Sequence, residues 1–221
     1  MKKQALVVGL GQFGMSLARS LAERGAEVIA VDARTERVQI ASKFAGQALC
    51  VDATEDGALE QLAPARRDIC VCAIGNEARE GAIIVTALLR QLGARFVVAR
   101  AADDLTQRIL TLVGANEVVN PERAFGERLA TRLIYDEILD ELPLGPDLVI
   151  TNLRPAESMV GRNLIELALP RRFGLTVVAV RQGDADGAAI TQPDPRRPLR
   201  ADDTLIVVSP PGAVQKLAGS W

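Results

Sequence analysis

Ala5-Leu6-Val7-Val8-Gly9-Leu10-Gly11-Gln12-Phe13-Gly14 is the stretch that decides the fold. An apolar, β-branched run leads into glycines spaced G-x-G-x-x-G, and residues of helical period follow, which predicts a strand, a tight loop and a helix. In that setting Gly9 permits the turn, Gly11 lets a phosphate approach the backbone, and Gly14 lets helix and strand pack closely. The start of the helix presents free N–H groups to phosphates. The stretch therefore predicts a phosphate-binding loop, to which Gln12 and Phe13 also belong.

An acidic residue stands where the second strand of such a fold ends. Asp32 follows the run Glu27 to Val31, about 20 residues beyond the glycine loop. A carboxylate at this position accepts hydrogen bonds from ribose hydroxyls and repels a 2′-phosphate, which disfavours NADP. We therefore expect Asp32, with Ala33 and Arg34 after it, to hold the ribose of a nucleotide. The alternative is a glycine-rich turn beside a surface aspartate, with no ligand.

Short β-branched runs alternate with longer segments of helical period from residue 5 to about residue 119. This alternation is typical of βα units around a parallel sheet. The predicted strands are Ala5 to Val8, Glu27 to Val31, Ala48 to Val51, Ile69 to Ala73, Phe96 to Ala99 and Glu117 to Val119. The predicted helices are Phe13 to Arg24, Thr35 to Phe44, Glu77 to Leu92 and Leu105 to Val113. We expect a Rossmann-like α/β domain, doubly wound, with helices on both faces of the sheet.

Two further loops follow strands at the edge where such sheets bind ligands. Asp52-Ala53-Thr54 comes after the third strand and is expected to border an adenine ring. Ile74-Gly75-Asn76 comes after the fourth and is expected to lie along the phosphates. Each of these loops is also consistent with a plain turn and N-cap. Arg100 and Glu122 follow the fifth and sixth strands, and each alone is also consistent with a solvated charge.

The chain changes character after Pro121. A long helix is predicted from Glu122 to Glu141, and Pro143-Leu144-Gly145-Pro146 cannot continue it. We therefore place the N-terminal domain at residues 1–135, with a crossover helix to about residue 142, and a small α+β domain at residues 143–221. Its predicted elements are strands at Leu148 to Leu153, Thr176 to Arg181, Ala188 to Thr191 and Thr204 to Ser209, helices near Asn163 to Leu169 and Ala213 to Leu217, and a hairpin loop at Gly183 to Gly187.

Composition and charge exclude several classes of function. Lys and Arg number 26 against 28 Asp and Glu, the net charge is −2, and aromatic residues make up only 3%. Without a positive field or stacking platforms, the chain is not expected to bind nucleic acid. Its apolar runs are far shorter than the roughly 20 residues of a membrane span. We expect a cytoplasmic protein, because the N-terminal apolar run meets a glycine too soon for a signal peptide.

The absence of histidine leaves few ways to build a catalytic site. Histidine is the commonest general base and zinc ligand, and the chain has none. Cys50, Cys70 and Cys72 lack C-x-x-C spacing and are expected to be small buried core residues. A small NAD-dependent oxidoreductase is the alternative to a ligand-binding module. It would need a proton donor, and Tyr135, the one tyrosine, has leucine rather than lysine four residues on.

The motifs taken together resemble a known family. The segments are GLGQFGMSLA at 9–18, VDATE at 51–55, AIGNE at 73–77, VAR at 98–100 and GANEVVNPE at 114–122. They are similar to the nucleotide-binding domain in regulatory subunits of bacterial Trk/Ktr potassium transporters, the RCK domain (regulator of potassium conductance). LRPAESMVGRNLIELALPRRFGLTVVAVRQGD and ITQPDPRRPLRADDTLIVVSPPGAVQKL resemble the RCK C-terminal domain. The resemblance therefore covers essentially the whole chain.

This resemblance implies a non-enzymatic subunit that assembles through dimers into an octameric ring beneath a membrane-embedded potassium-translocating partner. ATP and ADP, or NAD and NADH, would bind the N-terminal domains and change the shape of the ring, and Arg100 would meet phosphate charge. Glu122 matches an acid that helps bind a cation with ATP in Ktr members, so Mg²⁺ or Ca²⁺ is expected there. Several Ktr members carry an arginine that reaches a neighbouring subunit's phosphate where this chain has Gln12.

The resemblance also implies a second ligand site in the C-terminal part. Some members bind cyclic di-AMP at a dimer interface, and Leu164, Ile165, Arg171 and Pro193 fall in the matching region. The alternative there is a loop and dimer contact without a ligand. A regulatory domain of another cation channel or of an antiporter also remains open, since it would share the nucleotide chemistry and differ in partner.

Overall fold

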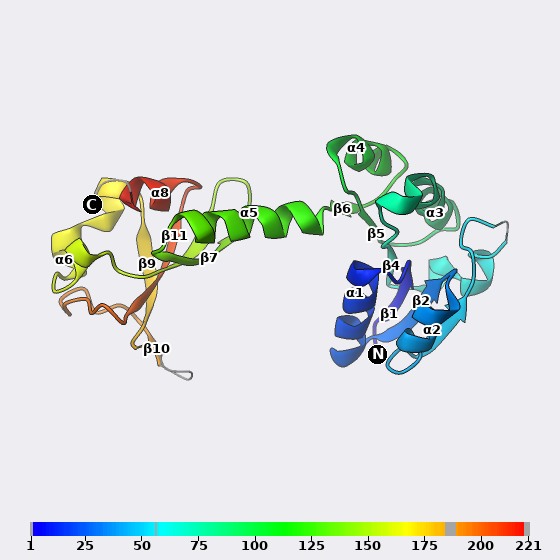
Figure 1. Cartoon of the computed structure of the whole chain (residues 1–221), viewed down its shortest axis with the longest axis horizontal. Coiled ribbons are helices and arrows are strands. Elements are labelled where there is room, and N and C mark those ends of the chain that lie inside the picture. The colour runs from blue at the N-terminus through cyan, green and yellow to red at the C-terminus, as the bar shows by residue number, and fades with distance from the viewer. Residues whose placement is uncertain (1, 56, 184–188, 219–221) are drawn as a thin grey trace. The chain divides into compact units, whose positions relative to one another are not determined.

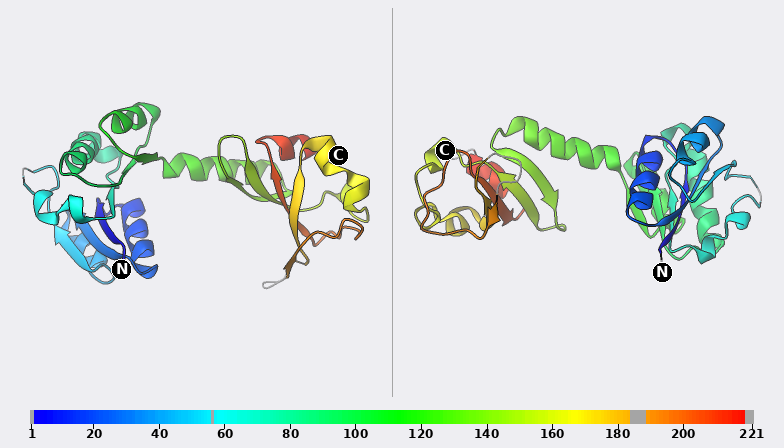
Figure 2. Two further views of the ribbon diagram at one scale, coloured as in Figure 1. Left: turned by 180° about the vertical axis from the view of Figure 1, so that it is seen from behind. Right: turned by 90° about the horizontal axis from the view of Figure 1, so that it is seen from below.

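The computed structural model describes residues 2–55, 57–183 and 189–218. The chain forms two compact units, Met1–Arg123 and Ala124–Trp221, which are shown in Figures 1 and 2. Each unit has its own hydrophobic core. The units are described separately below.

The N-terminal unit is built on a six-stranded sheet in which every neighbouring pair is parallel. The strand order is β3-β2-β1-β4-β5-β6. The strands are β1 (Gln4–Val8), β2 (Glu27–Asp32), β3 (Gln47–Cys50), β4 (Ile69–Cys72), β5 (Val97–Arg100) and β6 (Glu117–Val119). The winding reverses between β1 and β4, and ligands of such sheets bind at this switch point, outside the carboxyl ends of the strands.

Helices cover both faces of this sheet, as the sequence predicts (Figure 1). Residues of α1 (Gln12–Glu23) and α2 (Thr35–Ala41) share a core cluster with one face. Residues of α3 (Arg79–Gln91) and α4 (Asp104–Leu112) pack on the other. Three short 3₁₀ helices complete the unit, namely η1 (Glu60–Leu62), η2 (Pro64–Arg66) and η3 (Asn76–Ala78). The predicted doubly wound α/β fold is confirmed.

The three cysteines do not share one environment. Cys70 and Cys72 are buried in the core on one face of the sheet, as two residues at i and i+2 in a strand should be. Burial raises the pKa of the Cys70 thiol to about 11, and burial likewise raises the pKa of Cys72. The prediction that Cys50 is buried is wrong, because Cys50 ends the edge strand β3 and is exposed.

The segment after Pro121 differs from the prediction. Helix α5 is Pro121–Ile134, and it ends well before Glu141. Residues Ile138–Pro143 form strand β7, which pairs antiparallel with β8 (Val149–Leu153). The predicted helix to Glu141 is therefore wrong. Its last residues belong to a hairpin, and residues 124–142 lie in the second compact unit rather than the first.

The C-terminal unit contains a five-stranded antiparallel sheet in the order β10-β9-β11-β8-β7. Its other strands are β9 (Thr176–Arg181), β10 (Ile190–Thr191) and β11 (Thr204–Ser209). Its helices are η4 (Glu157–Met159), α6 (Leu164–Leu167), α7 (Leu169–Phe173) and α8 (Ala213–Ala218). The sequence predicts the α+β class and most of these elements. It does not predict β7, η4 or α7, and residues 184–188, where it places a hairpin loop and the start of a strand, lie outside the described residues.

Across residues 2–55, 57–183 and 189–218, none of the helices combines the length and the apolar character that crossing a lipid bilayer requires.

Candidate functional site

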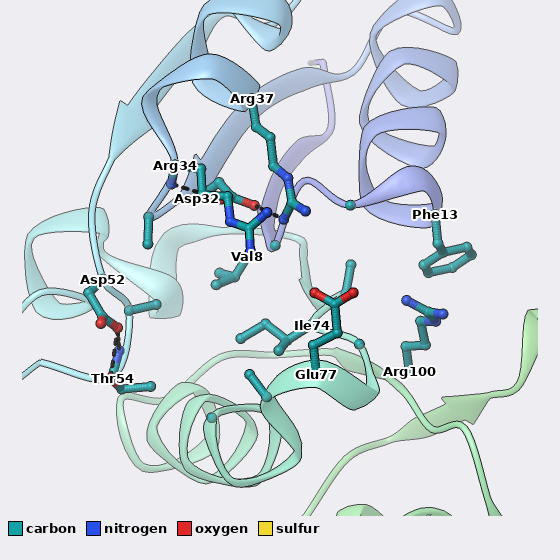
Figure 3. A pocket seen from close by; sticks show the side chains of 18 of the residues that line it. Val8, Phe13, Asp32, Arg34, Arg37, Asp52, Thr54, Ile74, Glu77 and Arg100 are labelled. Atoms are coloured by element: carbon teal, nitrogen blue, oxygen red, sulfur yellow. Dashed lines mark hydrogen bonds and ion pairs between the residues drawn. The ribbon is translucent and has the colours of Figure 1, made fainter.

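A cleft of about 930 Å³ opens at the carboxyl ends of β1 to β5 (Figure 3). It brings together candidate residues from all the loops that the sequence analysis identifies. The candidates that line it are Gly9, Gly11, Gln12, Phe13, Asp32, Ala33, Arg34, Asp52, Ala53, Thr54, Ile74, Gly75, Arg100 and Glu122. Asn76 begins η3, and nothing is described of its side chain. Residues dispersed over more than a hundred positions of sequence thus form one site.

The three glycines of the loop differ in their structural surroundings. Gly9 has φ +93°, and a Cβ there would lie 2.9 Å from the Ile74 nitrogen. A Cβ on Gly14 would lie 1.8 Å from the Gly9 carbonyl oxygen, so Gly14 lies under the loop and permits close helix–strand packing. A Cβ on Gly11 would meet nothing within 4 Å, so the free space beside it belongs to the cleft. Gly11 is the N-cap residue of α1, and no side chain of the described residues caps the helix there.

Asp32 links the glycine loop to the end of β2. Its Oδ2 accepts the Leu10 N–H at 2.6 Å, and its Oδ1 accepts the Arg34 N–H at 2.9 Å. Arg37 Nη1 also donates to Oδ2 at 3.3 Å. The carboxylate therefore shapes the loop that surrounds it. These donors leave one lone pair of Oδ1 unused, so Oδ1 has the capacity to accept one more hydrogen bond.

The Asp52–Thr54 loop forms a tight polar turn at the next strand end. Asp52 Oδ1 accepts the Thr54 hydroxyl at 2.7 Å and the Thr54 N–H at 2.9 Å. These two hydrogen bonds hold the pKa of the Asp52 carboxyl below its ordinary value. Ala53 is buried between them. Asp52, Ala53 and Thr54 all line the cleft.

Arg100 and Glu122 form an ion pair on the opposite wall, joined through Arg100 Nη2 and Glu122 Oε1. The Arg100 guanidinium lies 5.9 Å from the centre of the Phe13 ring, near the limit for a cation–π contact (Figure 3). Glu122 is in the first turn of α5. It does not cap that helix, because Asn120 Oδ1 accepts the Arg123 N–H at 3.0 Å.

The cleft also contains residues that the sequence analysis missed. They are Val8, Arg37, Val51, Ala73, Glu77, Ala78, Glu80, Gly81 and Ile84. Gly81 and Ile84 lie three apart on α3, so helical spacing could have located them once one was known. Nothing in the sequence separates Glu77 and Glu80 from ordinary acids on a helix surface.

The lining carries more negative than positive charge. Three arginines and five carboxylates line the cleft, which gives a formal charge of −2. Two of the arginines, Arg34 and Arg37, lie beside Asp32 (Figure 3). Arg100 is therefore the cation at the wall formed by Gly75 and Phe13. An anionic ligand would depend there on Arg100 and on the N–H groups at the start of α1.

The residues of the second candidate site lie in the C-terminal unit. Leu164 and Ile165 begin α6, and Arg171 is in α7. Pro193 follows β10, and the Ile165 N–H donates to the nearby Pro195 carbonyl at 3.3 Å. The α6 start and the segment after β10 are thus neighbours. Ile165 is exposed.

The sheet order, the glycine loop at the switch point and the small antiparallel domain that follows in sequence define a class: two-domain proteins with a Rossmann-type N-terminal domain. The TrkA-N domain family matches residues 5–121 and the TrkA-C domain family matches residues 148–219. The chain belongs to the TrkA-N/TrkA-C family of RCK proteins.

Relatives match over nearly the whole chain. It is 31% identical over 208 residues to Ktr system potassium uptake protein A of Vibrio alginolyticus, covering 94% of this chain and 93% of the relative. It is 30% identical over 208 residues to Ktr system potassium uptake protein C of Bacillus subtilis, covering 94% and 92%. Among solved structures, the GsuK channel bound to NAD has a TM-score of 0.69 at 18% identity. That match covers 100% of this chain and 40% of the GsuK chain, and it shows the fold.

Proposed function

We propose that the chain is a nucleotide-binding, non-enzymatic regulatory subunit of a Ktr-type potassium uptake system. The observation that carries this proposal is the cleft itself, in which the glycine loop, the start of α1 and Asp32 meet at the switch point of the sheet. The relatives named for Ktr potassium uptake support the choice of system. Ligand binding would act through a change of conformation rather than through chemistry.

The proposed ligand is ATP or ADP, or NAD or NADH. Gly11 and the first N–H groups of α1 would hold phosphates at the helix N-terminus. Gly9, whose own N–H donates to the Val31 carbonyl at 2.8 Å, would form the turn that brings the phosphates to these donors. The free lone pair on Asp32 would accept a ribose hydroxyl. The Asp52–Thr54 turn would border the adenine, and Arg100 would meet phosphate charge. NAD is the ligand of one GsuK structure with this fold.

A divalent cation, Mg²⁺ or Ca²⁺, is proposed to enter only together with ATP. Among the described residues no group of three His, Cys, Asp or Glu side chains gathers to bind a metal. Glu122 lines the cleft and would supply one carboxylate oxygen, while phosphate oxygens and waters would complete the shell, as Mg²⁺ commonly requires. The cation would relieve repulsion between the phosphates and the acidic lining.

The proposed assembly is a ring of dimers, up to an octamer, at the cytoplasmic side of a membrane-embedded potassium-translocating subunit. Helix α5 supports self-association: none of its 14 residues is buried, and Phe125, Leu133 and Ile134 are exposed. Large apolar side chains exposed on one helix favour an interface. In the C-terminal unit, cyclic di-AMP is proposed to bind beside Leu164, Ile165, Arg171 and Pro193 at a dimer contact.

Calorimetric titration of the full chain with ATP, ADP, NADH and cyclic di-AMP tests the ligand, and the mass of each complex in solution tests the assembly. We expect saturable adenine-nucleotide binding, no turnover and a mass above that of a monomer. Steady NADH oxidation with any substrate would contradict the non-enzymatic role. A monomer at micromolar concentration, with and without nucleotide, would contradict the ring.

A further inference from the structure

Packing against Phe13 and Gly75 holds the Arg100 guanidinium at the cleft wall, in addition to its ion pair with Glu122. The side chain is only 19% exposed, and its Nε is inaccessible to solvent without a hydrogen-bond partner among the described residues. The Phe13 ring lies against it on one side. On another side, a Cβ on Gly75 would come within 2.9 Å of Nη1. The guanidinium is thus held in place and has donors to spare.

The contact between Glu122 and Arg100 is not needed to stabilise the start of α5. The N-cap of α5 is supplied by Asn120, and Glu122 is 59% exposed. An exposed glutamate in the first turn of a helix gains from the helix dipole in any rotamer. In its contact with Arg100, the Glu122 carboxylate therefore occupies an N–H donor of a guanidinium that lines the cleft.

We infer that Glu122 is an intramolecular competitor of the nucleotide phosphate for Arg100, an inference that rests on the proposed nucleotide binding. A carboxylate and a phosphate both bind a guanidinium through paired, charge-assisted hydrogen bonds. Within the described cleft lining, Arg100 is the arginine that does not lie beside Asp32. Arg79 also lies near Gly75 and Arg100, outside that lining, and its guanidinium is paired with Asp103. Phosphate binding exchanges one anion for the other.

The exchange reaches α5 directly. The ion pairs Arg100–Glu122 and Arg123–Asp104 join the first turn of α5 to the end of β5 and the start of α4. A phosphate on Arg100 frees Glu122 and leaves the second pair. Because α5 continues into the second unit, nucleotide binding alters the attachment of the segment that joins the two units. Phe13 and Gly75 act as positioning residues that keep Arg100 at the exchange point.

A double-mutant cycle on the full chain tests this inference. ADP affinity is measured by calorimetry in EDTA for the wild type, Glu122→Gln, Arg100→Gln and the double variant. We expect Glu122→Gln to tighten ADP about tenfold, as the glutamine no longer competes as an anion, and Arg100→Gln to weaken ADP about tenfold. In the Arg100→Gln background, Glu122→Gln should have almost no effect, because there is no guanidinium left to release.

Two control variants separate the exchange from other effects. Asp104→Asn removes the other ion pair of the α5 first turn, lies outside the cleft lining, and should leave ADP affinity unchanged. Glu77→Gln removes a cleft carboxylate and should give the same small gain whether or not Arg100 is present. Suppose that the wild type binds ADP. If Glu122→Gln then raises ADP affinity equally with and without Arg100, or does not raise it at all, the proposed competition is refuted. If the wild type binds no adenine nucleotide, the proposed function fails and the inference falls with it.

Amide hydrogen exchange is a second measurement. It should change if phosphate releases Glu122, and it should not change if Glu122 only repels the phosphate through its charge. Adding ADP should speed amide exchange in the segment that spans β6 and the first turn of α5. In Glu122→Gln that segment should already exchange fast and respond little to ADP. Unchanged exchange in the wild type on saturation with ADP would refute the release of the α5 first turn.

Discussion

Replacing Asp32 with alanine separates two roles of one carboxylate, the shaping of the glycine loop and the proposed grip on ribose. The change removes the acceptor of the Leu10 N–H, and Leu10 is only 2% exposed. A buried donor left without a partner costs about 1 to 3 kcal/mol. The lost contact with Arg37, whose side chain is 33% exposed, adds less than about 1 kcal/mol. The Arg34 N–H belongs to an exposed residue and can turn to water.

The N-terminal unit should therefore lose about 2 to 3 kcal/mol of stability in Asp32→Ala. At about 4 °C per kcal/mol for a domain of this size, its melting temperature should fall by about 8 to 12 °C. Far-ultraviolet circular dichroism is the suitable probe. No tyrosine or tryptophan falls within residues 1–123, so the fluorescence of these residue types would not report on the sheet unit.

Nucleotide affinity should fall as well, by about tenfold to a hundredfold for a lost hydrogen bond to a charged acceptor, measured where the variant is fully folded. Arg37→Ala is the matched control. It removes only the half-exposed ion pair and should lower the melting temperature by less than about 4 °C. An Asp32→Ala chain that melts with the wild type would refute the structural role. Unchanged affinity would refute the ribose contact.

The remaining predictions concern three other places in the chain. Gly14→Ala should abolish folding of the sheet unit, since its Cβ would lie 1.8 Å from a loop carbonyl, whereas Gly11→Ala should keep the melting temperature and weaken nucleotide binding, because its Cβ enters free cleft space. Burial opposes the charge of Asp203, but hydrogen bonds from Arg197 hold its pKa below the ordinary value. The stability that this pair contributes to the C-terminal unit should be complete above about pH 4 and lost as the pH falls through the lowered pKa, and Asp203→Asn should flatten that acid limb in melts recorded from pH 2 to 6. A maleimide should modify one thiol of the native chain, Cys50, and all three only after denaturation, as mass spectrometry would show.

The strands of the sheet unit are predictable because each is a short apolar run bounded by glycines or polar turns. The predicted strand ends differ from the observed ones by at most one residue: Glu117–Val119 matches at both ends, and Phe96 to Ala99 is shifted by one from Val97–Arg100. A parallel strand buried on both faces is a nearly continuous apolar run, so it can be recognised from its amino-acid composition. The residues at its carboxyl end then follow from topology, which is why Asp32 and Asp52 could be placed at the cleft from the sequence.

The strand Ile138–Pro143 could not be predicted in the same way. Ile134 and Ile138 keep a spacing of four, so local periodicity favours a continued helix. What decides the segment is its pairing with β8 across a short loop, in which the Leu144 N–H donates to the Leu148 carbonyl. Pro143 fits because β7 is an edge strand, where a missing N–H is tolerated. Proline and glycine there mark a hairpin, not the end of a helix.

The pairing of side chains could not be predicted from the sequence either. It changes the interpretation of Glu122, the acidic residue after the sixth strand. Read alone, Glu122 is either a helix cap or a ligand of a nucleotide-bound cation. The structure gives the cap to Asn120 and the carboxylate to Arg100. Our two proposals for Glu122 are then two stages of one path: the acid leaves Arg100 when phosphate arrives, and it is then free to bind the cation that offsets the cleft's formal charge of −2. Under the proposed exchange, a net negative site whose arginine is already paired with Glu122 would bind a highly charged nucleotide only by releasing that glutamate. Glu122 lies in the first turn of α5, the helix that continues into the second unit, so its release would reach the segment that joins the two units.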